Sequence, residues 1–162
     1  MKADHTQAEL KAFVGAYRDH EPELSLYEDG AWALAHYGAM GRMGLITDGT
    51  HSVQSAKVRA LALERRFAEI VYTGALGPDR AFAKPHSLAF ERIACALGGP
   101  SDRYVYVGDN PSKDFVAPNA LGWTSVWVQR PGGIHDGAEV AAGGEPRHTI
   151  ASLTELPGVL ST

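Results

Sequence analysis

The chain has 162 residues, of which 44% are hydrophobic and 21% are charged, and its formal net charge is −4. This length predicts one domain with a substantial hydrophobic core. The acidic balance and the lack of a basic stripe exclude an electrostatic nucleic-acid interface. No apolar run is long enough to span a membrane or to form a signal core. With one cysteine, Cys95, these features predict a cytoplasmic protein without a nucleic-acid or membrane partner.

The first forty residues predict two helices joined by an extended segment. Leu10, Phe13 and Tyr17 belong to an apolar stripe that predicts a helix over residues 6–20. Residues 24–27 are predicted to be extended. Asp29-Gly30 begins a second predicted helix, which ends near Gly38 or Gly41.

From residue 43 onward, predicted strands and helices alternate along the chain. The strands cover residues 43–47, 69–73, 104–107, 125–128 and 148–150, and the helices cover residues 51–67, 86–97, 112–121 and 152–160. Parallel strands need helical crossovers, so this alternation predicts an α/β fold: a Rossmann-like parallel sheet with helices on both faces.

The strand over residues 104–107 runs into a pair of carboxylates. Gly108-Asp109 follows the strand, and Asp114 comes five residues later at a predicted helix start. The glycine is expected to let the backbone turn sharply. Ligands of open α/β sheets bind at the carboxyl ends of the strands, and carboxylate oxygens suit Mg²⁺, so Asp109 and Asp114 are the predicted metal ligands. A simpler interpretation of Asp114 alone is that it complements the helix dipole.

Two further segments follow strands on the same predicted rim. Thr47 ends a strand and Asp48-Gly49 turns into a helix, so a hydroxyl and backbone N–H groups could hold a phosphoryl oxygen there. Lys84 precedes the stiff Pro85 and supplies a point charge. Each segment alone has a plainer interpretation, a helix cap at Thr47 and a surface lysine at Lys84.

The order of these segments resembles the haloacid dehalogenase (HAD) superfamily of phosphohydrolases. Leu45-Ile-Thr47-Asp-Gly resembles the second motif of that family, Lys84-Pro85 the third, and Val107-Gly108-Asp109-Asn110 through Asp114 the fourth. The resemblance implies that Thr47 and Lys84 act in catalysis. It also implies that Thr47, Asp48, Gly49 and Lys84 bind phosphate and that Asp109 and Asp114 bind Mg²⁺. The expected substrate is a small phosphorylated metabolite.

The sequence departs from the family at its first motif. Family members begin with a strand that ends in Asp-x-Asp, whose first aspartate is the covalent nucleophile, and no such motif occurs in these 162 residues. The resemblance therefore implies a HAD-like core over residues 39–162 whose central strand is missing, and a helical cap remnant with its link over residues 1–38. A second copy of the chain, a companion polypeptide or the 24–27 segment could fill the missing strand position.

Two functions remain open at this stage, with a third interpretation ranked last. The chain is expected to be a Mg²⁺-dependent phosphohydrolase that needs a partner to supply the nucleophilic aspartate. Alternatively, it is an inactive HAD-like module that binds a phosphorylated ligand or a protein. A phospho-receiver domain also combines acids, a hydroxyl and a lysine, but there the acids come first along the chain.

Overall fold

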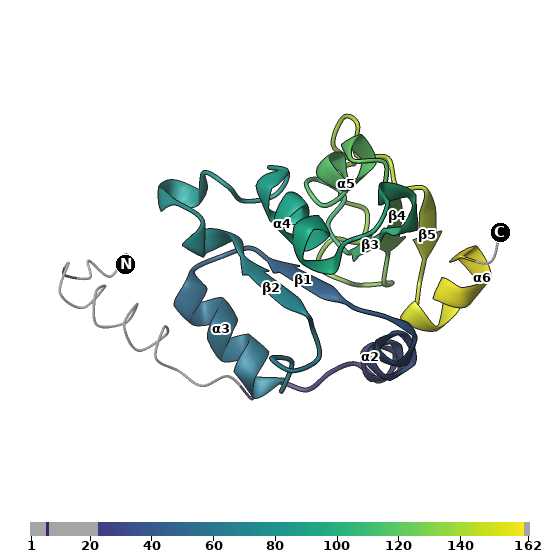
Figure 1. The fold of residues 1–162 in the computed structure, drawn as a ribbon, viewed down its shortest axis with the longest axis horizontal. Coiled ribbons are helices and arrows are strands. Elements are labelled where there is room, and N and C mark those ends of the chain that lie inside the picture. Colours follow the sequence, from purple (N-terminus) through teal and green to yellow (C-terminus); the bar gives the residue numbers. More distant parts are fainter. Residues whose placement is uncertain (1–5, 7–22, 161–162) are drawn as a thin grey trace, which may run out of the picture.

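The computed structural model describes residue 6 and residues 23–160, so all of the helix predicted over residues 6–20 except Thr6 lies outside the described residues. In chain order, the main helices and strands are α2 (Glu28–Met40), β1 (Gly44–Thr47), α3 (His51–Ala60), β2 (Glu69–Tyr72), α4 (Leu88–Leu97), β3 (Val105–Gly108), α5 (Val116–Ala120), β4 (Thr124–Val128), β5 (His148–Ile150) and α6 (Leu156–Leu160). Figure 1 shows the arrangement of these elements. In the part of the chain that the structure describes, no helix has the length and apolarity to cross a bilayer.

All strand pairs among the described residues are parallel, which confirms the predicted α/β class. The strands form two separate sheets. One has the order β1-β2 and the other the order β3-β4-β5. Each connection between paired strands passes through helical or loop segments, as parallel pairing requires.

Neither β1 nor β3 has a partner on its second edge among the described residues. β1 pairs with β2, and β3 pairs with β4, but no ladder joins β1 to β3. In Figure 1 the strands follow one another across the molecule in the order β2, β1, β3, β4, β5, so the two unpaired edges face each other. All four β1 residues are only half-buried, whereas four of the five β4 residues are fully buried.

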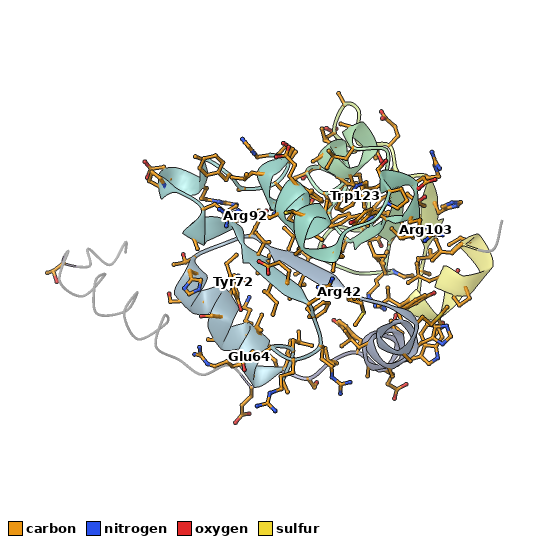
Figure 2. All side chains as sticks on the ribbon, in the orientation of Figure 1. Arg42, Glu64, Tyr72, Arg92, Arg103 and Trp123 are labelled. Carbon is orange, nitrogen blue, oxygen red and sulfur yellow. The ribbon has the colours of Figure 1, made fainter. Side chains whose placement is uncertain are left out.

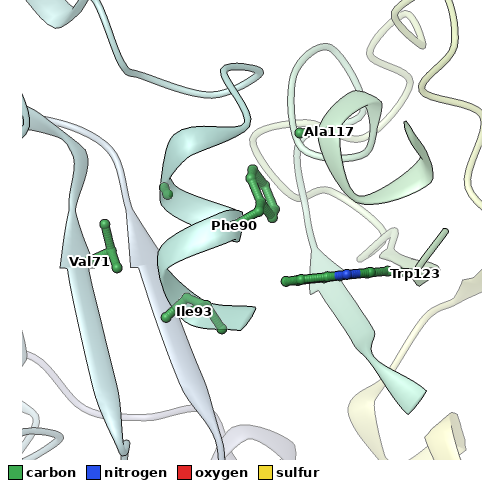
Figure 3. Packing of buried hydrophobic residues seen from close by; sticks show 6 residues of the cluster. Val71, Phe90, Ile93, Ala117 and Trp123 are labelled. Atoms are coloured by element: carbon green, nitrogen blue, oxygen red, sulfur yellow. The ribbon is translucent and has the colours of Figure 1, made fainter. Parts of the chain in front are cut away.

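The larger hydrophobic core connects the two sheets through α4. Phe90 and Ile93 of α4 pack with Val71 of β2 on one side and with Trp123 on the other (Figure 3). The Phe90 ring lies 4.9 Å from the Tyr106 ring and 5.8 Å from the Trp123 ring, both measured between centroids. Figure 2 shows Trp123 among the packed side chains between α4 and α5. The apolar face of α4 therefore covers one face of both sheets.

A second core cluster lies on the opposite face of β3. Val126, Val128, Ile150 and Leu156 form it, with Val107 and Tyr37 packed against them. Tyr106 belongs to the first cluster and Val107 to the second, as expected because successive side chains of a strand point to opposite faces. The α2 helix thus contributes to this second face through Tyr37, although none of its residues is fully buried.

The helix predicted after β1 is shorter than expected. The prediction ran to Phe67, but α3 ends at Ala60. Ala62 has a φ of 52°, a left-handed conformation that cannot continue a right-handed helix. Residues 24–27 form no strand, so they do not fill the position between β1 and β3. The predicted division between residues 38 and 39 falls within α2.

Candidate functional site

The carboxyl ends of β1 and β3 meet in a network of ion pairs. Asp48 follows β1, and Lys113 and Asp114 follow β3. Lys113 Nζ lies 2.7 Å from Asp48 Oδ2, and Lys84 Nζ lies 2.8 Å from Asp114 Oδ1. Both ion pairs connect groups that belong to different sheets. The predicted site residues Asp48, Lys84 and Asp114 are therefore brought together.

Asp48 is the centre of this network. Its Oδ1 accepts hydrogen bonds from the Thr73 hydroxyl at 2.9 Å and from the Lys84 backbone N–H at 3.1 Å. Its Oδ2 accepts one from Lys113 Nζ at 2.7 Å. The carboxylate is only 7% exposed and is fully used in fixing the turns around it. A phosphate bound by this segment would repel the Asp48 carboxylate if it shared the donors from Thr73, Lys84 and Lys113. It would therefore contact other backbone N–H groups of the segment.

Lys84 is held in place by the peptide bond that follows it and by two side chains. The Lys84–Pro85 bond is cis. Its ammonium group donates to the Tyr106 hydroxyl at 3.2 Å in addition to its ion pair with Asp114. The Lys84 side chain is 10% exposed. An ammonium group has three donors, so one remains for a bound oxyanion.

Asp114 is the most deeply buried charged group of the site, with a side chain only 2% exposed. Its Oδ2 accepts the Asn110 backbone N–H at 3.0 Å. A Cβ atom on Gly108 would lie 2.6 Å from that same Oδ2. Gly108 does not have a positive φ, so the glycine is needed for the close approach of Asp114 and not for the sharp turn that the sequence suggested.

Thr47 and Asp109 lie on the rim but do not enter the network through their side chains in the described part of the chain. Thr47 Oγ1 donates to Gln54 Oε1 at 2.9 Å. Asp109 is exposed, and its backbone carbonyl accepts a hydrogen bond from Trp127 Nε1 at 3.0 Å. Gly49 has a φ of 119°, which explains why a glycine follows Asp48. The Asp109 carboxylate is therefore available to a ligand.

Lys113 and Thr73 were missed by the sequence analysis. Both use their side chains to bind Asp48. Lys113 directly precedes Asp114, and Thr73 directly follows β2, the strand paired with β1. A polar residue at the carboxyl end of β2 was a usable signal for Thr73, since parallel strand ends share one rim.

The charges of the site stabilise one another's ionised forms. Burial acts to raise the pKa of Asp48. Hydrogen bonds from the Lys113 side chain and the Lys84 backbone N–H, together with the charge of the Lys84 ammonium group, outweigh burial and hold this pKa below its ordinary value. Burial works to lower the pKa of Lys84, whereas Tyr106, Asp114 and Asp48 raise it, and the balance keeps the pKa above its ordinary value. Both groups are therefore charged at neutral pH.

Asp48→Asn is expected to lower the free energy of unfolding by about 1–3 kcal/mol at pH 7, because Lys113 loses its ion pair. A lowered folded-state pKa gives stability that is present above the unfolded pKa and is lost as the pH falls through the folded pKa. The difference in unfolding free energy between wild type and variant should therefore shrink in acid.

Urea unfolding at pH 7 and about pH 3 measures this difference. Asp102→Asn, at an exposed position, is the control. An equal difference at both pH values would contradict the role assigned to Asp48.

The carboxylate oxygens of the site are suitable ligands for a hard cation, but only a few carboxylates are near one another. Asp109 and Asp114 offer oxygen ligands of the type that Mg²⁺ takes. Within the described residues, no group of three or more His, Cys, Asp or Glu side chains is placed to hold a metal ion. Asp114 Oδ2 accepts the Asn110 backbone N–H, whereas Oδ1 lies 2.8 Å from Lys84 Nζ but has no hydrogen-bond partner among the described residues. The site therefore fits a Mg²⁺ ion held by one or two carboxylates together with water and substrate oxygens.

The fold and the site together define a class: a parallel α/β protein with a hydroxyl, a lysine and two acids at the carboxyl ends of its strands. Similar architecture is found in a HAD phosphatase from Thermococcus onnurineus, with a TM-score of 0.66, 26% identity, and coverage of 83% of this chain and 58% of that one. The putative HAD-hydrolase YfnB from Bacillus subtilis, in a magnesium-bound structure, has a TM-score of 0.74 at 17% identity. It covers 100% of this chain and 66% of that one.

Sequence comparison leads to the same class. Residues 81–156 match the family model of HAD-hydrolase-like proteins. A phosphoserine phosphatase from Thermus thermophilus is 30% identical over 65% of this chain and 41% of its own length. An enolase-phosphatase E1 from Streptomyces avermitilis is 30% identical over 73% of this chain and 51% of its own length. The chain spans about half the length of these relatives. These matches confirm the resemblance to the HAD-like hydrolase superfamily that the sequence motifs implied.

Proposed function

We propose that this chain carries the phosphate-binding and metal-binding part of a Mg²⁺-dependent phosphohydrolase that cleaves phosphate monoesters of small metabolites. The nucleophilic carboxylate would come from outside these 162 residues. The observation that carries this proposal is the meeting of Asp48, Lys84 and Asp114 on one rim, with Thr47 and Asp109 at the adjacent strand ends.

Each side chain has a defined task in this proposal. Phosphoryl transfer requires positioning and charge stabilisation around the phosphoryl oxygens. Lys84 would use its third donor to bind one of these oxygens, while Tyr106 and Asp114 hold the ammonium group. The Thr47 hydroxyl would turn from Gln54 to bind a second oxygen. Backbone N–H groups near Gly49 would complete the phosphate contact.

Asp109 and Asp114 would hold the metal ion. A bound Mg²⁺ would neutralise charge on the phosphoryl group and orient it. Asp109 offers an exposed carboxylate, and Asp114 a buried one that is fixed by the Asn110 backbone N–H. Lys113 would keep the turn after β1 in place through Asp48.

A second function is favoured by one specific observation: the 162 residues contain no Asp-x-Asp motif that could attack the phosphorus. The chain would then bind a phosphorylated ligand or a protein without turnover. Hydrolysis and binding are measured separately, so one set of experiments distinguishes the two functions.

The test is a comparison of turnover with binding. The chain, purified under native conditions together with any bound partner, is assayed against a panel of phosphate monoesters with and without Mg²⁺, and calorimetry with inorganic phosphate is run in parallel. Hydrolysis that requires Mg²⁺ and is lost in Asp109→Ala supports the hydrolase. Saturable phosphate binding without hydrolysis supports the binding module. No binding and no hydrolysis would exclude both functions for the isolated chain.

A further inference from the structure

An open hollow lies between the start of α2 and the turn that follows β5. Its volume is about 610 Å³, and the residues that line it are Tyr27, Glu28, Asp29, Trp32, Ser152 and Thr154. Figure 1 shows α2 beside the C-terminal helix α6, which follows that turn. The hollow shares no residue with the ion-pair network of Asp48, Lys84 and Asp114. It is therefore a second place where a ligand of small-molecule size could bind.

The wall of the hollow is held in place by Asp29. Its Oδ2 accepts hydrogen bonds from Arg130 Nη2 at 2.7 Å, from the Ser152 hydroxyl at 3.1 Å and from the Leu153 backbone N–H at 2.9 Å. The Asp29 side chain is 11% exposed. These contacts fix the start of α2 to the segment after β5, and the ion pair with Arg130 balances the Asp29 charge. A ligand would therefore meet a wall that is already formed, which lowers the cost of binding.

The Tyr27 ring already attracts a cation of the protein itself. Arg130 Cζ lies over this ring, 4.8 Å from its centroid. Tyr27 is also 72% exposed, so its side chain is not part of the core. A guanidinium group over an aromatic face is attracted by the negative potential of the ring. The contact shows which sign of charge this part of the surface attracts.

Trp32 provides a second aromatic ring. It comes four residues after Glu28, so the two side chains lie on the same face of α2. His36 stacks on the indole with 4.8 Å between ring centroids and 13° between the planes. The indole also lines the hollow, so the ring face that His36 leaves open is the one available to a ligand. Tryptophan is the aromatic side chain that binds cations best.

Glu28 supplies a negative charge that has no ionic partner. It is exposed and forms no ion pair with any of the described residues. Acidic residues in the first turn complement the helix dipole, which accounts for Glu28 alone but not for the aromatic rings beside it. An anion would be repelled by Glu28, whereas a cation would gain both its carboxylate and the aromatic faces.

We propose that this hollow binds an organic cation: an ammonium or guanidinium group, carried either by a free small molecule or by a lysine or arginine side chain of another protein. The cation would lie against the Trp32 ring, with Glu28 balancing its charge and Tyr27 at the side of the hollow. A bare metal ion fits less well, because hard cations need several oxygen ligands and aromatic walls supply none. The proposal does not depend on the phosphohydrolase function, since no residue of the phosphate site is involved.

Choline is the probe, and its neutral analogue, in which a carbon atom replaces the charged nitrogen, is the control ligand. Each is titrated into the full chain at constant ionic strength, without phosphate or Mg²⁺, and NMR follows the indole N–H resonances of the three tryptophans. Choline is expected to shift the Trp32 resonance saturably and to bind at least about tenfold more tightly than the neutral analogue. The resonances of the buried Trp123 and Trp127 should not move.

Variants of the hollow separate this site from general attraction to an acidic surface. Glu28→Gln is expected to weaken choline binding about two- to fivefold, whereas Glu91→Gln, at an exposed position of α4, should leave it unchanged. Trp32→Leu removes the reporter, so saturation transfer from the protein to the choline methyl protons is measured instead, and its loss is expected. Unshifted Trp123 and Trp127 resonances verify that each variant is folded.

Capped Gly-Lys-Gly and Gly-Arg-Gly peptides distinguish the two sources of the cation. Tighter binding of a peptide than of choline would support a protein side chain, and the reverse a small molecule. Three results would overturn the proposal. These are no saturable shift of the Trp32 resonance with any of the cations, equal binding of choline and its neutral analogue, and a shift confined to Trp127. The last would place the cation near Asp109, whose carbonyl accepts the Trp127 N–H.

Discussion

Asp114→Ala is expected to lower the free energy of unfolding by about 3–5 kcal/mol, because it leaves the Lys84 ammonium buried without its carboxylate. The Asp114 side chain is 2% exposed and also fixes the Asn110 backbone N–H. Asp109→Ala is the matched control. It removes the same kind of group from an exposed position and should change the unfolding free energy by less than about 0.5 kcal/mol. Urea unfolding of the three proteins measures both effects.

The pairing of Asp114 with Lys84 can be separated from other causes of instability by a double-mutant cycle. Lys84→Met removes the charge but retains most of the side-chain length. In the Asp114→Ala background, Lys84→Met should restore part of the lost unfolding free energy, with a coupling energy between the two substitutions of about 0.5–3 kcal/mol. Additive effects of the two substitutions would show that the ion pair is not the cause. Equal stability of the Asp114→Ala and Asp109→Ala proteins would contradict the structural role of Asp114 altogether.

Phe90→Ala is expected to lower the free energy of unfolding by about 3–5 kcal/mol, because the ring is fully buried where α4 joins the two sheets. The ring packs edge-on against Tyr106 and Trp123, one from β3 and one beside β4. Its removal leaves a cavity that neither sheet can close alone. Trp123 lies in this cluster, so tryptophan fluorescence during urea unfolding follows the transition.

Val105→Ala is the control for Phe90→Ala. Val105 is 41% exposed, so its truncation should cost less than about 1 kcal/mol. A Phe90→Ala protein that loses less than about 1.5 kcal/mol would show that α4 does not bind the sheets together as described.

The sequence predicted the parallel α/β fold because its strands are short, apolar and separated by helical segments. All five predicted strand positions from residue 43 onward are confirmed within one or two residues. The end of α3 was wrong. The apolar pattern continues beyond the helix at Leu61, Leu63 and Phe67, but the left-handed conformation of Ala62 prevents the helix from continuing. No glycine or proline in this segment indicates that end in the sequence.

The candidate site was partly visible in the sequence. Lys84 was chosen because it precedes the stiff Pro85, and Asp114 because it stands at a predicted helix start; the structure pairs the two side chains. The partnership of Asp48 with Lys113 could not be predicted, because the two residues are 65 positions apart and meet only through the arrangement of the sheets. The close contact between Gly108 and Asp114 was missed for a related reason: a glycine in a sequence does not show whether it provides a turn or space.

Phosphate binding by the purified chain tests the central claim most directly. Calorimetry with inorganic phosphate is run with and without Mg²⁺ on wild type, Lys84→Met, and the exposed-site control Lys57→Met. A phosphate site built as described predicts saturable binding that strengthens with Mg²⁺, persists in Lys57→Met, and weakens at least about tenfold in Lys84→Met. Phosphate binding that is equal in all three proteins and indifferent to Mg²⁺ would contradict it.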